Sequence, residues 1–251
     1  MWLQTPDTIE HVLAKRQLEP ASEEEPDQST RKWHRHGAEV TPREALRSLP
    51  VVEIGIPETW LLSDFYSPRK LPRPILAKLK EADFYLVRLS CSFLPPHEES
   101  SVEWARFRAT LLPHPTTKEQ PLAFDLYPSE VVQAVKRHLK ITLNPLLKFQ
   151  EWEASLGSAE FGIEYSEIIP RIKGYIGDSV APIWDYSAGS DRTVQGTKWM
   201  HLLVKAPKGM TGGHVQLELE ADVLVKGTHL SAVLRHQQKQ ASTQLTVPLW
   251  G

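Results

Sequence analysis

The clearest pattern in the chain is the alternation of apolar and polar residues between 198 and 225. Within 198–206 the apolar residues Met200, Leu202 and Val204 alternate with Trp199, His201 and Lys205, and Leu203 is the one aliphatic residue on the opposite, polar face. A loop of Pro, Gly and Lys residues follows, and the alternation then continues regularly from 214 to 225. Period two indicates half-buried β-strands. We therefore predict a hairpin in which Met200 lies opposite Leu219 and both are buried.

The same alternation predicts a third strand directly after this hairpin. Lys226-Gly227 reads as a two-residue turn, because Gly supplies the positive φ that such turns need. Pairing Val225 with Thr228 then brings Val223 opposite Leu230. A last strand alternates from Thr243 to Leu249. It contains Pro248, which cannot donate to a ladder, so we expect it at the edge of a sheet.

The middle of the chain predicts further short elements. We expect strands at Asp83–Leu94, Val102–Leu112 and Leu122–Leu126, a short helix at Ile75–Glu81, and a hairpin at Glu151–Tyr165 that turns at Gly157-Ser158. Residues 166–196 have no clear period and contain four glycines. We interpret them as a long surface excursion that carries Trp184 and Tyr186.

The first 45 residues differ from the rest. Thr5-Pro6 begins a predicted short helix whose narrow apolar stripe includes Val12 and Leu13. Residues 19–30 are acidic and almost without apolar side chains, which is typical of a flexible linker. A compact basic patch follows, consisting of Arg31, Lys32, Trp33 and Arg35 together with two histidines. We expect residues 46–251 to form a β-rich globular domain, or two β subdomains that divide near 166–196.

These patterns predict a mainly β fold: an antiparallel β-sandwich or strongly curved sheets, with a short helical N-terminal segment. In a chain of 251 residues, the twenty prolines and thirteen glycines favour short strands over long helices. The net charge of −2 gives no reason to expect binding to nucleic acid or to an anionic membrane. Cys91 is the single cysteine, so no intrachain disulfide can form. We therefore expect a reducing, cytoplasmic compartment.

One row of polar residues could carry chemistry. In the three consecutive antiparallel strands predicted above, the solvent-exposed face carries His201, Glu218 and Arg235, one on each strand. They could act as a base, the group that orients it and an anion binder, or they could be ordinary cross-strand pairs.

Metal and cofactor chemistry has less support. Four glutamates on one face of the predicted 151–165 hairpin could hold a cation, but a flat strand face spreads carboxylates apart. No His-Glu-x-x-His motif and no phosphate-binding loop is present. Neither a metal nor a cofactor is expected.

The pattern favours a non-enzymatic, cytoplasmic adaptor that acts by binding another protein. Its expected surfaces are the basic patch, the Trp184–Tyr186 excursion and the C-terminal edge strand, which also offers a route to oligomers. Two other classes remain open. A hydrolase-type enzyme would need residues 166–196 to close a pocket over His201. A pore- or assembly-forming protein would use amphipathic hairpins to build a larger sheet.

Overall fold

The computed structural model describes most of the chain. Its described residues are 2–4, 8–21, 47–65, 73–94, 100–131, 137–142, 160–165, 172–188, 193–225, 228–234 and 245–251.

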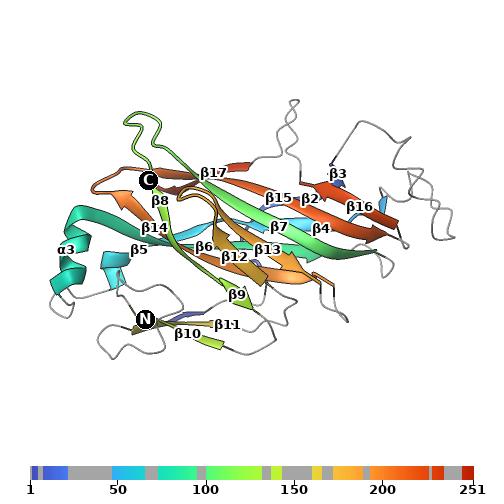
Figure 1. Cartoon of the computed structure of the whole chain (residues 1–251), viewed down its shortest axis with the longest axis horizontal. Coiled ribbons are helices and arrows are strands. Elements are labelled where there is room, and N and C mark those ends of the chain that lie inside the picture. Colours follow the sequence, from blue (N-terminus) through green and yellow to red (C-terminus); the bar gives the residue numbers. More distant parts are fainter. Residues whose placement is uncertain are drawn as a thin grey trace.

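The described residues form two large antiparallel sheets and a separate three-stranded one (Figure 1). The eight-stranded sheet has the order β3 (Glu19–Pro20), β16 (Thr228–Val233), β15 (Gly213–Val225), β7 (Ser100–Leu112), β13 (Pro182–Ser187), β12 (Ile172–Ile176) and β9 (Glu130–Val131), with β17 (Leu245–Trp250) also paired to β15. The six-stranded sheet has the order β2 (Val12–Gln17), β4 (Val51–Gly55), β6 (Ala82–Leu94), β14 (Gly196–Pro207) and β8 (Leu122–Tyr127), with β5 (Glu58–Leu61) also paired to β6.

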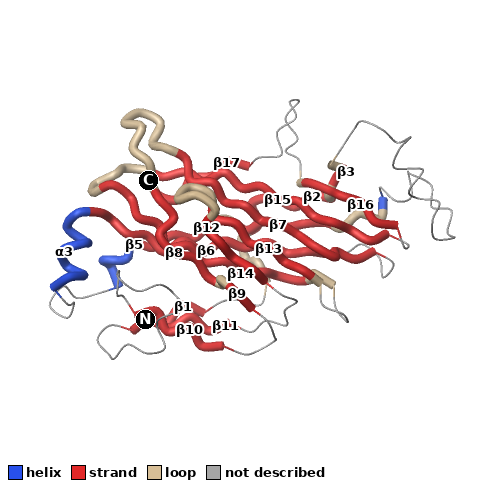
Figure 2. Tube along the Cα trace, viewed as in Figure 1, coloured by secondary structure: helices blue, strands red, loops and turns tan. Residues whose placement is uncertain are grey.

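The third sheet has β11 (Glu160–Tyr165) at its centre, between β1 (Trp2–Gln4) and β10 (Arg137–Thr142). Figure 2 shows these three strands apart from the larger sheets. A short 3₁₀ helix, η2, spans Leu62–Phe65, and α3 spans Arg73–Glu81. Pro74 in the first turn of α3 has its φ fixed by its ring at a value that suits a helix. The lysines in the last turn interact favourably with the negative end of the helix dipole. The predicted mainly β class is confirmed.

Apolar side chains from the two large sheets form one continuous core. Met200 and Val204 of β14 are fully buried, as are Val215 and Leu219 of β15. The alternation along both strands therefore predicted the buried faces correctly. Burial of this apolar area is the main force that holds the two sheets together.

The predicted hairpin between 198–206 and 214–225 is wrong, because its two strands lie in different sheets. β14 pairs with β6 and β8, so Met200 lies opposite Leu89 rather than Leu219. β15 pairs with β7 instead. A short connection can join two strands that are neighbours in one sheet, or it can cross from one sheet to the other. Both arrangements bury every second residue of each strand.

The next predicted pairing is confirmed. Val225 pairs with Thr228 and Val223 with Leu230 in the β15–β16 ladder. Among the described strands, β17 pairs with β15 alone, as expected for a strand that ends at an edge. The predicted strands at 83–94, 102–112 and 122–126 and the helix at 75–81 are also present, as β6, β7, β8 and α3.

The predicted N-terminal helix is wrong. Val12 and Leu13 lie in β2, which pairs antiparallel with β4, and Glu19-Pro20 pairs with β16. The apolar stripe is narrow because β2 is an edge strand that buries only part of one side. The basic patch Arg31–Arg35 lies outside the described residues, so its predicted role stays a prediction.

One further prediction for the middle of the chain is wrong, and another lies partly outside the described residues. Trp184 and Tyr186 lie on β13, inside the eight-stranded sheet, and both are fully buried in the core. They are therefore not part of an exposed partner-binding surface. Glu160–Tyr165 does form a strand, which lies between β1 and β10, whereas residues 151–156, the other arm of the predicted hairpin, lie outside the described residues.

Candidate functional site

The segment from 130 to 173, which we call the insertion, leaves and re-enters the eight-stranded sheet at adjacent strands. It leaves through β9 and returns through β12, where Val131 pairs with Ile172 and Glu130 with Lys173. In the sequence, β10 and β11 lie between β9 and β12, and they pair antiparallel with each other. β1 adds a parallel strand on the other side of β11. Both ends of the insertion are thus anchored side by side in one ladder, which we call the root.

The two ladders within the insertion have almost the same register. In an antiparallel ladder the sum of the two paired residue numbers describes the register. This sum is 303 in the root, where Val131 lies opposite Ile172. They add to 302 in the β10–β11 ladder, where Arg137 lies opposite Tyr165. The intervening residues are 132–136 on one arm and 166–171 on the other. A single bulged residue would therefore join both ladders into one continuous hairpin.

Close backbone contact holds the root against the end of β8. The N–H of Gly174 donates a hydrogen bond to the carbonyl oxygen of Ser129 over 2.8 Å. A Cβ atom on Gly174 would lie 2.3 Å from the Pro128 carbonyl oxygen and 3.0 Å from Cδ1 of Trp184. Only glycine lets the backbone approach this closely, so this position fixes the root to the sandwich.

A row of charges of alternating sign crosses the eight-stranded sheet and ends at the root. The register aligns residues from β15, β7, β13, β12 and β9 in the order Glu220, Arg106, Asp185, Lys173, Glu130. We call this row the charge ladder. Opposite charges on neighbouring strands stabilise this register.

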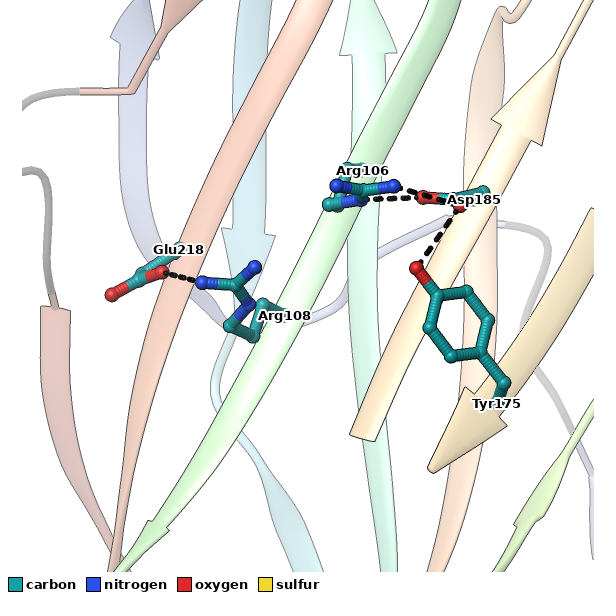
Figure 3. Close-up of polar contacts among 5 residues, drawn as sticks. All are labelled: Arg106, Arg108, Tyr175, Asp185 and Glu218. Carbon is teal, nitrogen blue, oxygen red and sulfur yellow. Dashed lines mark hydrogen bonds and ion pairs between the residues drawn. The ribbon is translucent and has the colours of Figure 1, made fainter. Parts of the chain in front are cut away.

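The best-formed contact of the charge ladder joins Arg106 and Asp185 (Figure 3). Nε of Arg106 donates to Oδ1 of Asp185 over 2.8 Å, and Nη2 donates to Oδ2 over 3.1 Å. The Tyr175 hydroxyl donates to the same carboxylate over 3.4 Å. The guanidinium lies over the Trp104 ring at 5.0 Å. Hydrogen bonding to Asp185 raises the pKa of Arg106, so the guanidinium stays positively charged.

Glu218 belongs to this face and not to a site with His201. Nη1 of Arg108 donates to Glu218 over 3.3 Å, as Figure 3 shows. The predicted row His201–Glu218–Arg235 is wrong in geometry, because His201 lies in the six-stranded sheet and Glu218 in the eight-stranded one. Arg235 lies outside the described residues.

His201 is buried on the outer face of the six-stranded sheet, the face turned away from the core. It is 1% exposed, and neither of its ring nitrogens has a hydrogen-bond partner among the described residues. Its register neighbours are Arg88 on β6 and Tyr127 on β8, and its ring centroid lies 6.5 Å from that of Tyr127. Burial, and secondarily the charge of Arg88, lowers the pKa of His201 from 6.5 to about 3.

Arg88 is held firmly beside His201. Its guanidinium binds the Glu58 carboxylate through Nε at 3.1 Å and Nη2 at 2.6 Å. It also lies between the Trp60 and Trp199 rings, at 5.3 and 5.1 Å from their centroids. These contacts fix a positive charge close to a neutral imidazole. A hydrolytic base would need a partner that orients it, and no side chain in the described part of the chain hydrogen-bonds to His201.

Two properties of the described residues bear on function. No group of three His, Cys, Asp or Glu side chains in this part of the chain is placed to hold a metal ion. Nor does the described part contain a helix with the length and apolar character needed to cross a membrane.

Comparison with known proteins identifies no family. No family model matches the chain, and no curated protein matches it. Solved structures do match over much of the chain, at low identity. A pore-forming protein matches with a TM-score of 0.39 and 9% identity, covering 79% of this chain and 90% of its own.

Two toxins of Clostridium perfringens also match. The NetB toxin in its membrane-inserted form has a TM-score of 0.33 and 8% identity, covering 79% of this chain and 88% of its own. Delta-toxin has a TM-score of 0.40 and 6% identity, covering 83% of this chain and 90% of its own. The predicted adaptor function is contradicted by these matches, none of which is an adaptor, and we do not keep it. At such scores and identities, the case for any activity rests on the geometry of this chain.

Proposed function

We propose that this protein forms assemblies of the pore type, in which the insertion leaves the sandwich and becomes one continuous β-hairpin. The observation that carries the proposal is the near-identical register of the root and the β10–β11 ladder. Because one bulge suffices to join them, the insertion can extend while keeping the pairs that it already has. The root would remain in the eight-stranded sheet as the fixed end of the hairpin.

The insertion is long enough to cross a bilayer. From Glu130 to Lys173 it supplies two arms of about twenty residues each. At about 3.3 Å per residue, each arm reaches roughly 65 Å when extended. A strand that crosses a membrane needs about 9–11 residues. The arms would therefore span the hydrocarbon core and still leave a stem between the membrane and the sandwich.

The residue pattern of the β10–β11 ladder suits a hairpin that meets lipid on one side and water on the other. Apolar residues occupy the register positions Leu139–Ile163 and Ile141–Phe161. The positions between and beside them hold His, Lys, Thr, Glu and Gly. Alternation with period two is typical of membrane-crossing strands. The proposal makes a lipid bilayer the partner, although the net charge of the chain gave no reason to expect one.

β1 offers a way to test whether the insertion must move. It pairs with β11, with Leu3 opposite Ile163, and β2 begins at Val12 and is anchored in the six-stranded sheet. A disulfide between cysteines at 3 and 163 would tether the hairpin to that sheet through the eight residues 4–11. Such a tether reaches at most about 30 Å, which is less than half the length of an extended arm.

The experiment measures dye release from vesicles of phosphatidylcholine, phosphatidylethanolamine and phosphatidylglycerol. We expect the oxidised Leu3→Cys/Ile163→Cys variant to release no dye and to regain the level of the parent protein after reduction. Each single cysteine variant serves as a control and should release dye under both conditions. Equal release by the oxidised and reduced double variant, or no release by the parent, would refute the proposal.

A further inference from the structure

Exposed apolar side chains lie at both edges of the six-stranded sheet. In the described part of the chain, the large hydrophobic residues with exposed side chains are Val12 (43%), Ile56 (50%) and Leu122 (36%). Val12 lies on β2 and Leu122 on β8, the strands at the two ends of the order β2-β4-β6-β14-β8. Single exposed apolar residues are common on soluble proteins, but their concentration at both ends of one sheet indicates contact surfaces.

At the first edge the backbone holds two of these residues together. Val12 lies opposite Gly55, and the N–H of the next residue, Ile56, donates a hydrogen bond to the carbonyl oxygen of His11 over 2.9 Å. Glu10, two positions before Val12, is exposed as well. We call Glu10, Val12 and Ile56 the β2 patch. It combines exposed apolar groups with a negative charge.

At the second edge apolar and basic side chains lie together. Leu122 lies opposite the exposed Lys205 of β14. The Phe124 ring meets that of the buried Phe84 edge-on, with the ring centroids 5.5 Å apart. Nζ of Lys78 in α3 lies 5.9 Å from the Phe124 centroid. We call Leu122, Phe124, Lys78 and Lys205 the β8 patch, which combines apolar groups with positive charge.

We propose that the β2 patch of one copy of this protein binds the β8 patch of the next copy, so that copies join head to tail. This inference deepens the proposed function, on which it rests, by naming the surfaces that build the assembly. A contact between two different surfaces of identical chains is heterologous, and it repeats from copy to copy until the rotation between copies closes a ring. Neither patch contains a residue of the insertion, so the contact leaves the insertion able to extend.

Charge favours this pairing over a symmetric one. Two β2 patches placed together would bring Glu10 against its own copy, and two β8 patches would bring lysines against lysines. The head-to-tail pairing instead places Glu10 of one copy near Lys78 and Lys205 of the next. Lys15, further along β2, does not reverse the sign of the first edge, because Glu53 binds it at 2.6 Å. Like charges across an interface are unfavourable, so the two patches fit each other better than either fits itself.

The test joins thiols that are placed in the two patches. A Val12→Cys/Leu122→Cys variant is incubated with vesicles of phosphatidylcholine, phosphatidylethanolamine and phosphatidylglycerol and treated with a short bis-maleimide cross-linker. Within one chain these positions are four strand spacings apart, about 19 Å, which is beyond the reach of the linker. We expect a ladder of covalent dimers, trimers and larger species. The parent protein, whose Cys91 is buried, should give no cross-linked product.

Single variants distinguish head-to-tail contact from symmetric contact. Val12→Cys alone and Leu122→Cys alone should stay monomeric, whereas an equimolar mixture of the two should give dimers and nothing larger. A matched control, His229→Cys/Thr246→Cys, places two exposed thiols on β16 and β17 of the eight-stranded sheet and should give no ladder. Dimers from either single variant, a ladder from the control or no ladder from the double variant would overturn the proposal.

Charge reversal tests which groups meet. In the Val12→Cys/Leu122→Cys background, Glu10→Lys or Lys205→Glu alone should lower the initial rate of cross-linking by about fivefold, as expected for the loss of an exposed ion pair. The two reversals together should recover most of the rate, because the pair forms again with its signs exchanged. Failure of the combined reversal to recover the rate would overturn the proposed pairing.

Dye release from the same vesicles separates this inference from the proposed function. A ladder without dye release refutes the pore function alone. Dye release by the parent protein, together with no ladder from the double variant, refutes the head-to-tail contact alone and indicates that the two patches bind another partner.

Discussion

The root of the insertion can be tested by adding one methyl group at Gly174. In a Gly174→Ala variant the new Cβ would lie 2.3 Å from the Pro128 carbonyl oxygen and 2.7 Å from Cδ1 of Leu126. The backbone must retreat by about 1 Å to restore ordinary contact. Overpacking of this kind costs about 2 kcal/mol. Strain on the hydrogen bond to Ser129 adds about 1 kcal/mol, and the lower entropy of the unfolded alanine chain offsets about 0.7 kcal/mol. The net loss is about 2 kcal/mol.

A matched control lies three residues away. A Cβ atom on Gly177 would meet nothing within 4 Å, and its backbone does not adopt a positive φ. Gly177→Ala should therefore be neutral or stabilise the fold by up to about 1 kcal/mol. Urea denaturation followed by tryptophan fluorescence compares the two variants with the parent. Equal unfolding midpoints for the two alanine variants would show that β12 does not depend on close approach to Pro128, contrary to the contacts of the root.

Three further predictions concern the sandwich itself. Leu219→Ala should lower the free energy of unfolding by about 2–5 kcal/mol, because the side chain is buried in the core. Glu220→Ala, on the other face of the strand, should change it by no more than about 0.5 kcal/mol. Chemical denaturation that gave the reverse order would contradict the assigned faces. Cys91 should react slowly with a thiol reagent in native protein and quickly in denaturant, and fast native labelling would refute its burial. A double-mutant cycle of Arg106→Met and Asp185→Asn should give a coupling of about 0.5–1 kcal/mol that shrinks in about 1 M salt, and a salt-independent value would argue against an ionic origin.

The sequence predicted strand faces far better than strand partners. Alternation along β15 and β16 fixed both the buried faces and the register, because a two-residue loop leaves few alternatives. The connection from β14 to β15 is longer, and it passes from one sheet to the other. Period two reports only that one side of a strand is buried. The alternation is therefore the same whether the next strand along the chain pairs with this strand in one sheet or packs against it from the other side of the core.

The candidate site was harder to predict for a related reason. His201 occupies a position that the alternation marks as polar, yet it is buried because the outer face of the six-stranded sheet is covered too. The sequence contained one signal of this, the apolar residue Leu203 two positions along on the same face. Leu203 is also buried. The charge ladder gave no local signal, since its members come from five strands and meet only through tertiary register. Gly174 likewise could not be distinguished from a loop glycine.

The central pairing of the eight-stranded sheet has a consequence for how the chain reaches its native state. β7 and β15 pair along their whole length, with Leu112 opposite His214 and Ser100 opposite Val225. Partners are therefore separated by 102 to 125 residues along the chain. Contacts of such long range require most of the loop-closure entropy to be lost before the ladder forms, so folding takes milliseconds to seconds rather than microseconds. During synthesis β7 must wait for nearly the whole chain to emerge, and over this interval its edges remain open to association with other chains.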